Sequence, residues 1–195
     1  MDWEFLEPLK NNGEPVSLPA RVGWLAFYGI FLLYALFNKS GYLFIDIVFV
    51  PIHEGGHLLF SYFGHALMVA GGTILQLGVP LMLAIYFAFQ RQLAGTAFCG
   101  FLFFENFLNI ATYMADSRRL ELTYVTVGDP EFAEHDWLTM FSQLGILEYD
   151  TKIAGVVRLL GWLGMIAVVI WLGLKTQAAS DPGAGQNTLR PSSRI

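Results

Sequence analysis

The amino-acid sequence predicts an all-α integral membrane protein with about five transmembrane helices and a short amphipathic helix in the 120–152 loop. Of its 195 residues, 55% are hydrophobic, and the mean hydropathy is +0.51. Only 14% are charged, compared with about 25% in an ordinary soluble domain. The apolar residues gather in stretches of about 18 residues or more, which is the length that a helix needs to cross a bilayer. These observations favour a multi-pass membrane protein over a soluble domain with a large core.

Five apolar segments account for the predicted spans. They cover residues 20–37, 42–63, 66–89, 93–114 and 153–174, and short polar or glycine-containing connections separate the first four. In the polar loop before the last segment, five apolar residues fall at helical spacing: Trp137, Met140, Phe141, Leu144 and Leu147. This spacing predicts an amphipathic helix over residues 136–147, lying on the protein or at the membrane interface.

The spans define one membrane domain, residues 20–175, between two polar ends. Residues 1–19 are expected to form an N-terminal arm outside the membrane. Residues 176–195 have little to bury and are expected to be disordered. The net charge of −5 argues against a general nucleic-acid partner. The single cysteine, Cys99, excludes an intramolecular disulfide and a cysteine-based zinc site.

The motif His53-Glu54-Gly55-Gly56-His57 lies inside the second apolar segment. Two imidazoles four residues apart on a helix point to the same side and can hold one zinc ion between them. Glu54 is then placed to polarise a metal-bound water. Shuffling this composition produces an HExxH pattern about once in 350 sequences. Because ionisable groups at membrane depth are costly, this motif predicts a zinc-dependent active site within the bilayer.

A catalytic zinc usually takes a third protein ligand, and the fourth apolar segment offers candidates. Glu105, Asn109, Thr112 and Asp116 fall within roughly 60° of one another on a helix and form a polar stripe. Asp116 is the first choice as ligand, because a carboxylate at a helix end can reach a metal. Glu105 is the runner-up, or an acceptor for a ligand histidine. Asn109 could hydrogen-bond the substrate backbone or an oxyanion.

Two further groups have both a functional and a structural interpretation. His135 could be a zinc ligand if its loop folds back over the site, although the pair His135-Asp136 is more typical of a helix start. Gln76, in the third segment, could line a cleft but more simply joins helices. The glycines of that segment, Gly71, Gly72 and Gly78, are typical of close helix packing.

Residues 42–119 resemble the site-2 protease family of intramembrane zinc metalloproteases. The likeness rests on HEGGH in a transmembrane segment, the following GGTILQLGVPL and the later FENFLNIATYMAD. The chain would be a compact, divergent relative. The resemblance implies zinc bound by His53, His57 and an aspartate, which is Asp116 by position. It also implies that Glu54 is the catalytic acid and base, and that Asn109 corresponds to an asparagine of the family motif.

The expected function is therefore that of an intramembrane zinc metalloprotease-like hydrolase. It would cleave peptide bonds of membrane-embedded substrates through a zinc-activated water, so its partners would be membrane lipid and a membrane-protein or peptide substrate. The alternative is a non-proteolytic, metal-binding membrane scaffold or assembly protein. A metal transporter needs several sites along a path, which four histidines and one cysteine do not readily supply.

Overall fold

The computed structural model describes residues 17–38, 40–122 and 135–180, and within these ranges the protein is helical with no β-strand. Its longer helices are α2 (Leu18–Phe37), α3 (Asp46–Phe60), α4 (His65–Phe89), α5 (Leu93–Ala115), α6 (Asp136–Gln143) and α7 (Asp150–Ser180). Short 3₁₀ turns at Ser61–Phe63 and Leu147–Tyr149 follow α3 and precede α7. The all-α prediction is confirmed for the described residues.

Four helical segments are long and apolar enough to cross a membrane: α2, α4, α5 and Leu147–Gln177, which includes most of α7. The predicted second span differs from the others, because α3 has only 15 residues. At 1.5 Å per residue, α3 is about 22 Å long and shorter than the ~30 Å of bilayer hydrocarbon. Four of the five predicted segments therefore form helices that are long and apolar enough to cross a membrane.

The ends of the predicted membrane domain differ slightly from the helix bounds. Ser17 caps α2, since its hydroxyl accepts the backbone N–H of Ala20 at 3.4 Å, so the helix begins inside the predicted arm. At the other end, α7 continues to Ser180, beyond the predicted start of the tail. The rest of the predicted arm, residues 1–16, and of the tail, residues 181–195, lies outside the described residues.

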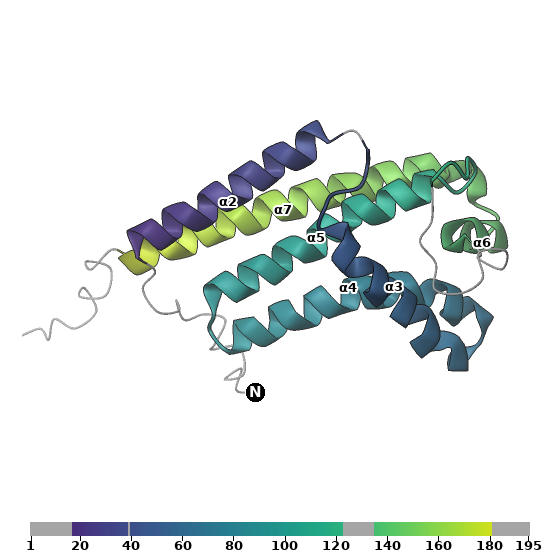
Figure 1. The fold of residues 1–195 in the computed structure, drawn as a ribbon, viewed down its shortest axis with the longest axis horizontal. Helices are drawn as coiled ribbons and strands as arrows, with labels where there is room; N and C mark the ends of the chain where they lie inside the picture. Colours follow the sequence, from purple (N-terminus) through teal and green to yellow (C-terminus); the bar gives the residue numbers. More distant parts are fainter. Residues whose placement is uncertain (1–16, 39, 123–134, 181–195) are drawn as a thin grey trace, which may run out of the picture.

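The four long helices pack side by side into an elongated bundle (Figure 1). In this bundle α2 and α5 each run antiparallel to α7, and α4 runs antiparallel to α5. A core of eight buried residues joins α2, α5, α7 and the segment before α3: Tyr28, Phe31, Leu43, Ala97, Phe101, Leu108, Met165 and Leu172. Small residues allow close approach, as at Gly164, where an added Cβ would clash with the Phe104 ring.

The short helix α3 begins about midway along the bundle and runs towards the end that carries α6 (Figure 1). It crosses α4 at glycines. A Cβ added to Gly71 would lie 2.6 Å from the Gly56 carbonyl oxygen, so only glycine permits this backbone contact. The crossing holds the HEGGH face of α3 directly against α4.

At the same end of the bundle, Arg118 joins the end of α5 to the start of α7. Its Nε and Nη2 donate to the two carboxylate oxygens of Asp150 at 2.8 and 2.6 Å. The loop helix α6 packs beside this junction, with Phe141 buried against Ile110 and Met114 of α5. The helix ends at Gln143 rather than at residue 147, because the chain turns at Gly145, whose φ is 68°.

Candidate metal centre

The two histidines of the HEGGH motif face the first residue of α6. His53 Nε2 lies 2.9 Å from Asp136 Oδ2, and His57 Nε2 lies 3.4 Å from the same oxygen. One potential ligand atom from each of the three residues lies within 4.8 Å of the other two. Ligand atoms around a tetrahedral zinc ion, at about 2.0 Å from the metal, lie about 3.3 Å apart. The observed spacing therefore fits one zinc ion.

The hydrogen bond at the other nitrogen of His57 determines its tautomer. His57 Nδ1 lies 2.8 Å from the backbone carbonyl oxygen of Met68 on α4. A carbonyl oxygen only accepts, so Nδ1 must carry the hydrogen. In the neutral imidazole, Nε2 then presents its lone pair towards Asp136, as a metal ligand requires.

The tautomer of His53 is determined in a similar way, by a series of hydrogen-bonded amide side chains. Asn106 donates its Nδ2 to the Leu102 carbonyl oxygen at 2.8 Å, which turns Asn106 Oδ1 towards Gln76. Gln76 Nε2 donates to Oδ1 of Asn106 at 2.7 Å and to Oδ1 of Asn109 at 3.0 Å. Gln76 Oε1 is therefore the atom that accepts from His53 Nδ1, at 2.9 Å. His53 also presents the lone pair of Nε2.

With both rings neutral, three hydrogen-bond acceptors converge at one point: Nε2 of His53, Nε2 of His57 and a carboxylate oxygen of Asp136. Burial would raise the pKa of Asp136, but the neighbouring imidazoles of His53 and His57 outweigh burial and hold this pKa below its ordinary value. Converging lone pairs repel unless a proton or a metal ion lies among them. The donor set of two imidazoles and one carboxylate suits zinc.

Gly72 of α4 leaves space in front of the same atoms. A Cβ at this position would lie 2.5 Å from His53 Nε2 and 2.7 Å from His57 Nε2. These distances approach the 2.0–2.1 Å, roughly, of a zinc–imidazole bond. The residues present therefore fit a bound zinc ion, and glycine is the residue that keeps its position open.

Asp136 reaches this position because α5 holds the start of α6. The backbone N–H of Asp136 donates to the hydroxyl of Tyr113 at 3.2 Å. The Tyr113 ring stacks on His135, with ring centroids 4.3 Å apart. His135 Nδ1 in turn accepts the backbone N–H of Leu138 at 3.2 Å and caps α6. Burial lowers the pKa of His135, which favours the neutral ring that this cap requires.

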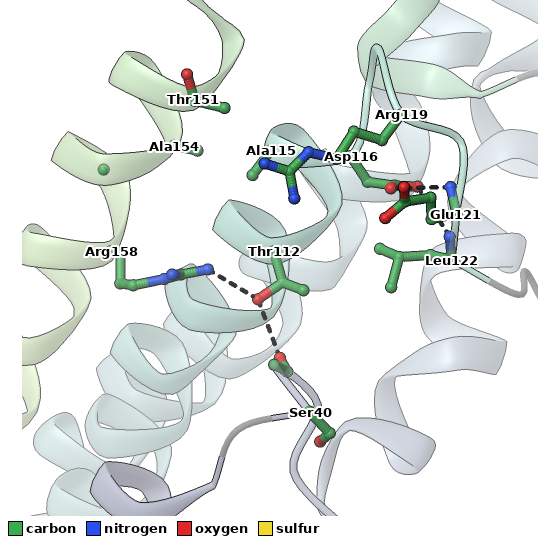
Figure 2. A pocket seen from close by; sticks show the side chains of 12 residues that line it. Ser40, Thr112, Ala115, Asp116, Arg119, Glu121, Leu122, Thr151, Ala154 and Arg158 are labelled. Atoms are coloured by element: carbon green, nitrogen blue, oxygen red, sulfur yellow. Dashed lines mark hydrogen bonds between the residues drawn. The ribbon is translucent and has the colours of Figure 1, made fainter.

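The structure does not place Asp116, the predicted third ligand, in the cluster with His53 and His57. Asp116 is the buried C-cap of α5, and its carboxylate accepts the backbone N–H groups of Glu121 and Leu122 at 3.0 and 3.2 Å (Figure 2). The prediction extended the helical stripe by one residue too many, because α5 ends at Ala115 and the chain turns there.

The other predicted residues lie farther into the bundle or beside the site. Glu105 is fully buried next to Asp46 of α3 and outside the ligand cluster. Asn109 supports the site indirectly, since it binds Gln76, which binds His53. Glu54 follows His53 on α3 and is half-buried. His135 is also outside the ligand cluster and acts as the cap of α6.

Sequence reasoning missed two contributions. Asp136 was interpreted only as a helix start, although an acidic residue beside one of four histidines in a membrane protein deserves consideration as a ligand. Gln76 was interpreted mainly as a link between helices. A polar residue within an apolar segment was the available signal, and its contact with His53 adds a second role.

Replacing Gly72 with alanine should weaken zinc binding by about 10–100-fold or more, because the methyl group would occupy the space in front of both Nε2 atoms. Zinc affinity, measured on purified protein by competition with a chromophoric chelator, tests this. Gly78→Ala on the same helix is the matched control, since a Cβ there meets nothing within 4 Å. Equal affinity in the two variants would show that the metal does not lie in front of Gly72.

The chemistry of the centre follows from its own atoms: two imidazoles, one carboxylate and the space that Gly72 leaves beside them. Comparisons with known proteins give no match to this chain, whether with family models, with curated proteins or with solved structures.

Proposed function

We propose that this protein is a zinc metalloprotease embedded in a membrane, which hydrolyses peptide bonds of membrane-embedded substrates. The observation that carries the proposal is the convergence of three lone-pair donors, His53, His57 and Asp136, in front of Gly72. Catalytic zinc sites typically have three protein ligands and one open position, whereas structural sites have four. The number of ligands and the neighbouring Glu54 favour hydrolysis over a purely structural role.

The proposed membrane placement follows from the outer surfaces of the helices. Ile30 on α2, Leu83 on α4 and Leu159 on α7 are large apolar residues with 44–69% exposure, which suits contact with lipid. The four long segments are proposed to cross the bilayer. We propose that α3 does not cross it alone but enters from mid-bundle and ends near one membrane face.

Access from that face would let water reach the site. The side chains of His53 and His57 are 15% and 24% exposed, whereas that of Asp136 is 5% exposed. The centre is thus open on the side of the imidazoles and closed behind the carboxylate. A substrate segment would have to unwind locally, because a helix keeps its peptide groups hydrogen-bonded within itself.

The division of labour follows from the positions of the residues. When bound, zinc would supply a Lewis acid that lowers the pKa of water to about 7. Glu54 would accept the proton from water and later deliver it to the leaving amine. Gln76 and the Met68 carbonyl would keep the two imidazoles in the orientation that binds metal.

The experiment uses wild-type protein purified in detergent and restored to liposomes. Elemental analysis should find about one zinc ion per chain, and model transmembrane peptides should be cleaved. A zinc chelator should stop cleavage, and added zinc should restore it. Zinc without cleavage across a peptide panel would instead support the metal-binding scaffold, and absence of zinc would reject both functions.

A further inference from the structure

A pocket with polar walls lies away from the metal centre, between the end of α5, the start of α7 and the segment after α2 (Figure 2). Its volume is about 450 Å³. Its polar walls come mainly from Thr112, Asp116, Arg119, Glu121, Thr151 and Arg158. None of the three proposed zinc ligands lines it, so the two sites are chemically separate.

Two guanidinium groups point into this pocket from different walls. Arg158 of α7 donates from Nη2 to the Thr112 hydroxyl at 3.1 Å, and Arg119 reaches in from beyond the end of α5 (Figure 2). Within the described ranges, neither arginine forms an ion pair with a carboxylate, whereas the neighbouring Arg118 is paired with Asp150. The pocket therefore holds two cationic groups whose charge-assisted hydrogen-bonding capacity is largely unused.

The acidic groups of the pocket do not take up this capacity. Both carboxylate oxygens of Asp116 accept backbone N–H groups, from Glu121 and Leu122. Glu121 also lines the pocket, but it is an exposed residue. An anion can thus approach the two guanidinium groups without displacing a described ion pair.

The depth of Arg158 indicates which anion is suitable. Arg158 lies eight residues after Asp150, about 12 Å along a helix that is long and apolar enough to span a membrane. Leu159, about 100° round the helix from Arg158, is 57% exposed, so the neighbouring surface of α7 would face acyl chains. A charged group at this depth is costly unless it pairs with another group. A phosphate at the interface would provide the partner, since guanidinium binds phosphate bidentately.

We propose that Arg119 and Arg158 bind the phosphate of a phospholipid headgroup, whose acyl chains lie along the exposed apolar face of α7. The proposal uses the membrane placement described above but not the zinc or the protease activity. A failure of this lipid site would therefore leave the hydrolase proposal intact. Absence of zinc or of protease activity would likewise leave the lipid site intact.

Native mass spectrometry of the full chain in detergent tests the proposal with dioleoylphosphatidylglycerol as the probe. The wild-type protein should retain one molecule of this lipid more tightly than any further molecules of it. The double variant Arg119→Gln/Arg158→Gln should bind this lipid at least about tenfold more weakly. Arg91→Gln is the matched control, because Arg91 is an exposed arginine in the α4–α5 turn at the other end of the bundle, and it should bind like wild type.

Two further probes separate the sources of the phosphate. Dioleoylglycerol has the same chains without phosphate and should not occupy the tight site. Inorganic phosphate at millimolar concentration should not displace the phospholipid. Unchanged lipid binding in the double variant would overturn the proposal, provided that thermal unfolding shows the variant is folded. Displacement by inorganic phosphate would overturn the lipid assignment in favour of a soluble phosphate, and tight dioleoylglycerol binding would show that the chains alone are recognised.

Discussion

Asp136→Asn should lose zinc, whereas Asp116→Asn should retain it. Asp136 provides one of the three converging ligand atoms, and a neutral amide is a much weaker zinc ligand than a carboxylate. The zinc affinity of Asp136→Asn should fall by more than the ~10–100-fold typical of residues that merely support a ligand. Peptide cleavage should fall to background. Elemental analysis and a competition titration on detergent-purified protein measure the first effect, and the peptide assay measures the second.

The comparison with Asp116→Asn makes this result specific. Asp116 accepts two backbone N–H groups at the end of α5, so its substitution should cost about 1–3 kcal/mol of stability without removing zinc. Thermal unfolding in detergent separates the two effects. If Asp116→Asn lost zinc and Asp136→Asn kept it, the predicted assignment of Asp116 as the third ligand would be restored and the geometry of α6 would be wrong.

The contrast between the two aspartates shows where sequence reasoning succeeds. Hydropathy over single segments predicted α2, α4 and α5 closely and the central part of α7, and the four-residue spacing placed His53 and His57 on one face of α3. Both inferences use local patterns that depend on a single helix. The third ligand depends on tertiary packing, because Asp136 lies 83 residues after His53 and reaches it through the docking of α6. No periodicity within a helix encodes that contact.

The three glycines of α4 show a similar limit. All were expected to permit helix packing, and Gly71 does so against Gly56 of α3. Gly72, one residue later, instead faces the imidazoles, and a Cβ on Gly78 would meet nothing within 4 Å. The sequence indicates a permissive segment, but the role of each glycine depends on which side of the helix the crossing helix contacts.

Gln76 illustrates why two interpretations of one residue can both hold. It does join helices, because it is on α4 and donates to Asn106 and Asn109 on α5. The same bonds leave only its Oε1 to face His53, which determines the imidazole tautomer. A polar residue in an apolar segment predicts hydrogen bonding, whereas the direction of those bonds requires the structure.

Glu54→Gln should reduce peptide cleavage by at least about 100-fold while zinc content stays unchanged. Glutamine has nearly the same size as glutamate but cannot accept the proton that hydrolysis releases. Glu54 is outside the cluster of ligand atoms, so its charge is not needed to hold the metal. The measurement combines the turnover number on a model transmembrane peptide with elemental analysis of the same preparation.

His53→Ala is the control for this variant, because it removes a ligand and should lose both zinc and cleavage. The two outcomes together separate chemistry from metal binding at adjacent positions of one helix. Full cleavage by Glu54→Gln would mean that another group accepts the proton, and the HEGGH glutamate would then have no catalytic role. Loss of zinc in Glu54→Gln would instead make Glu54 a metal ligand, which would raise the number of protein ligands to the four of a closed site.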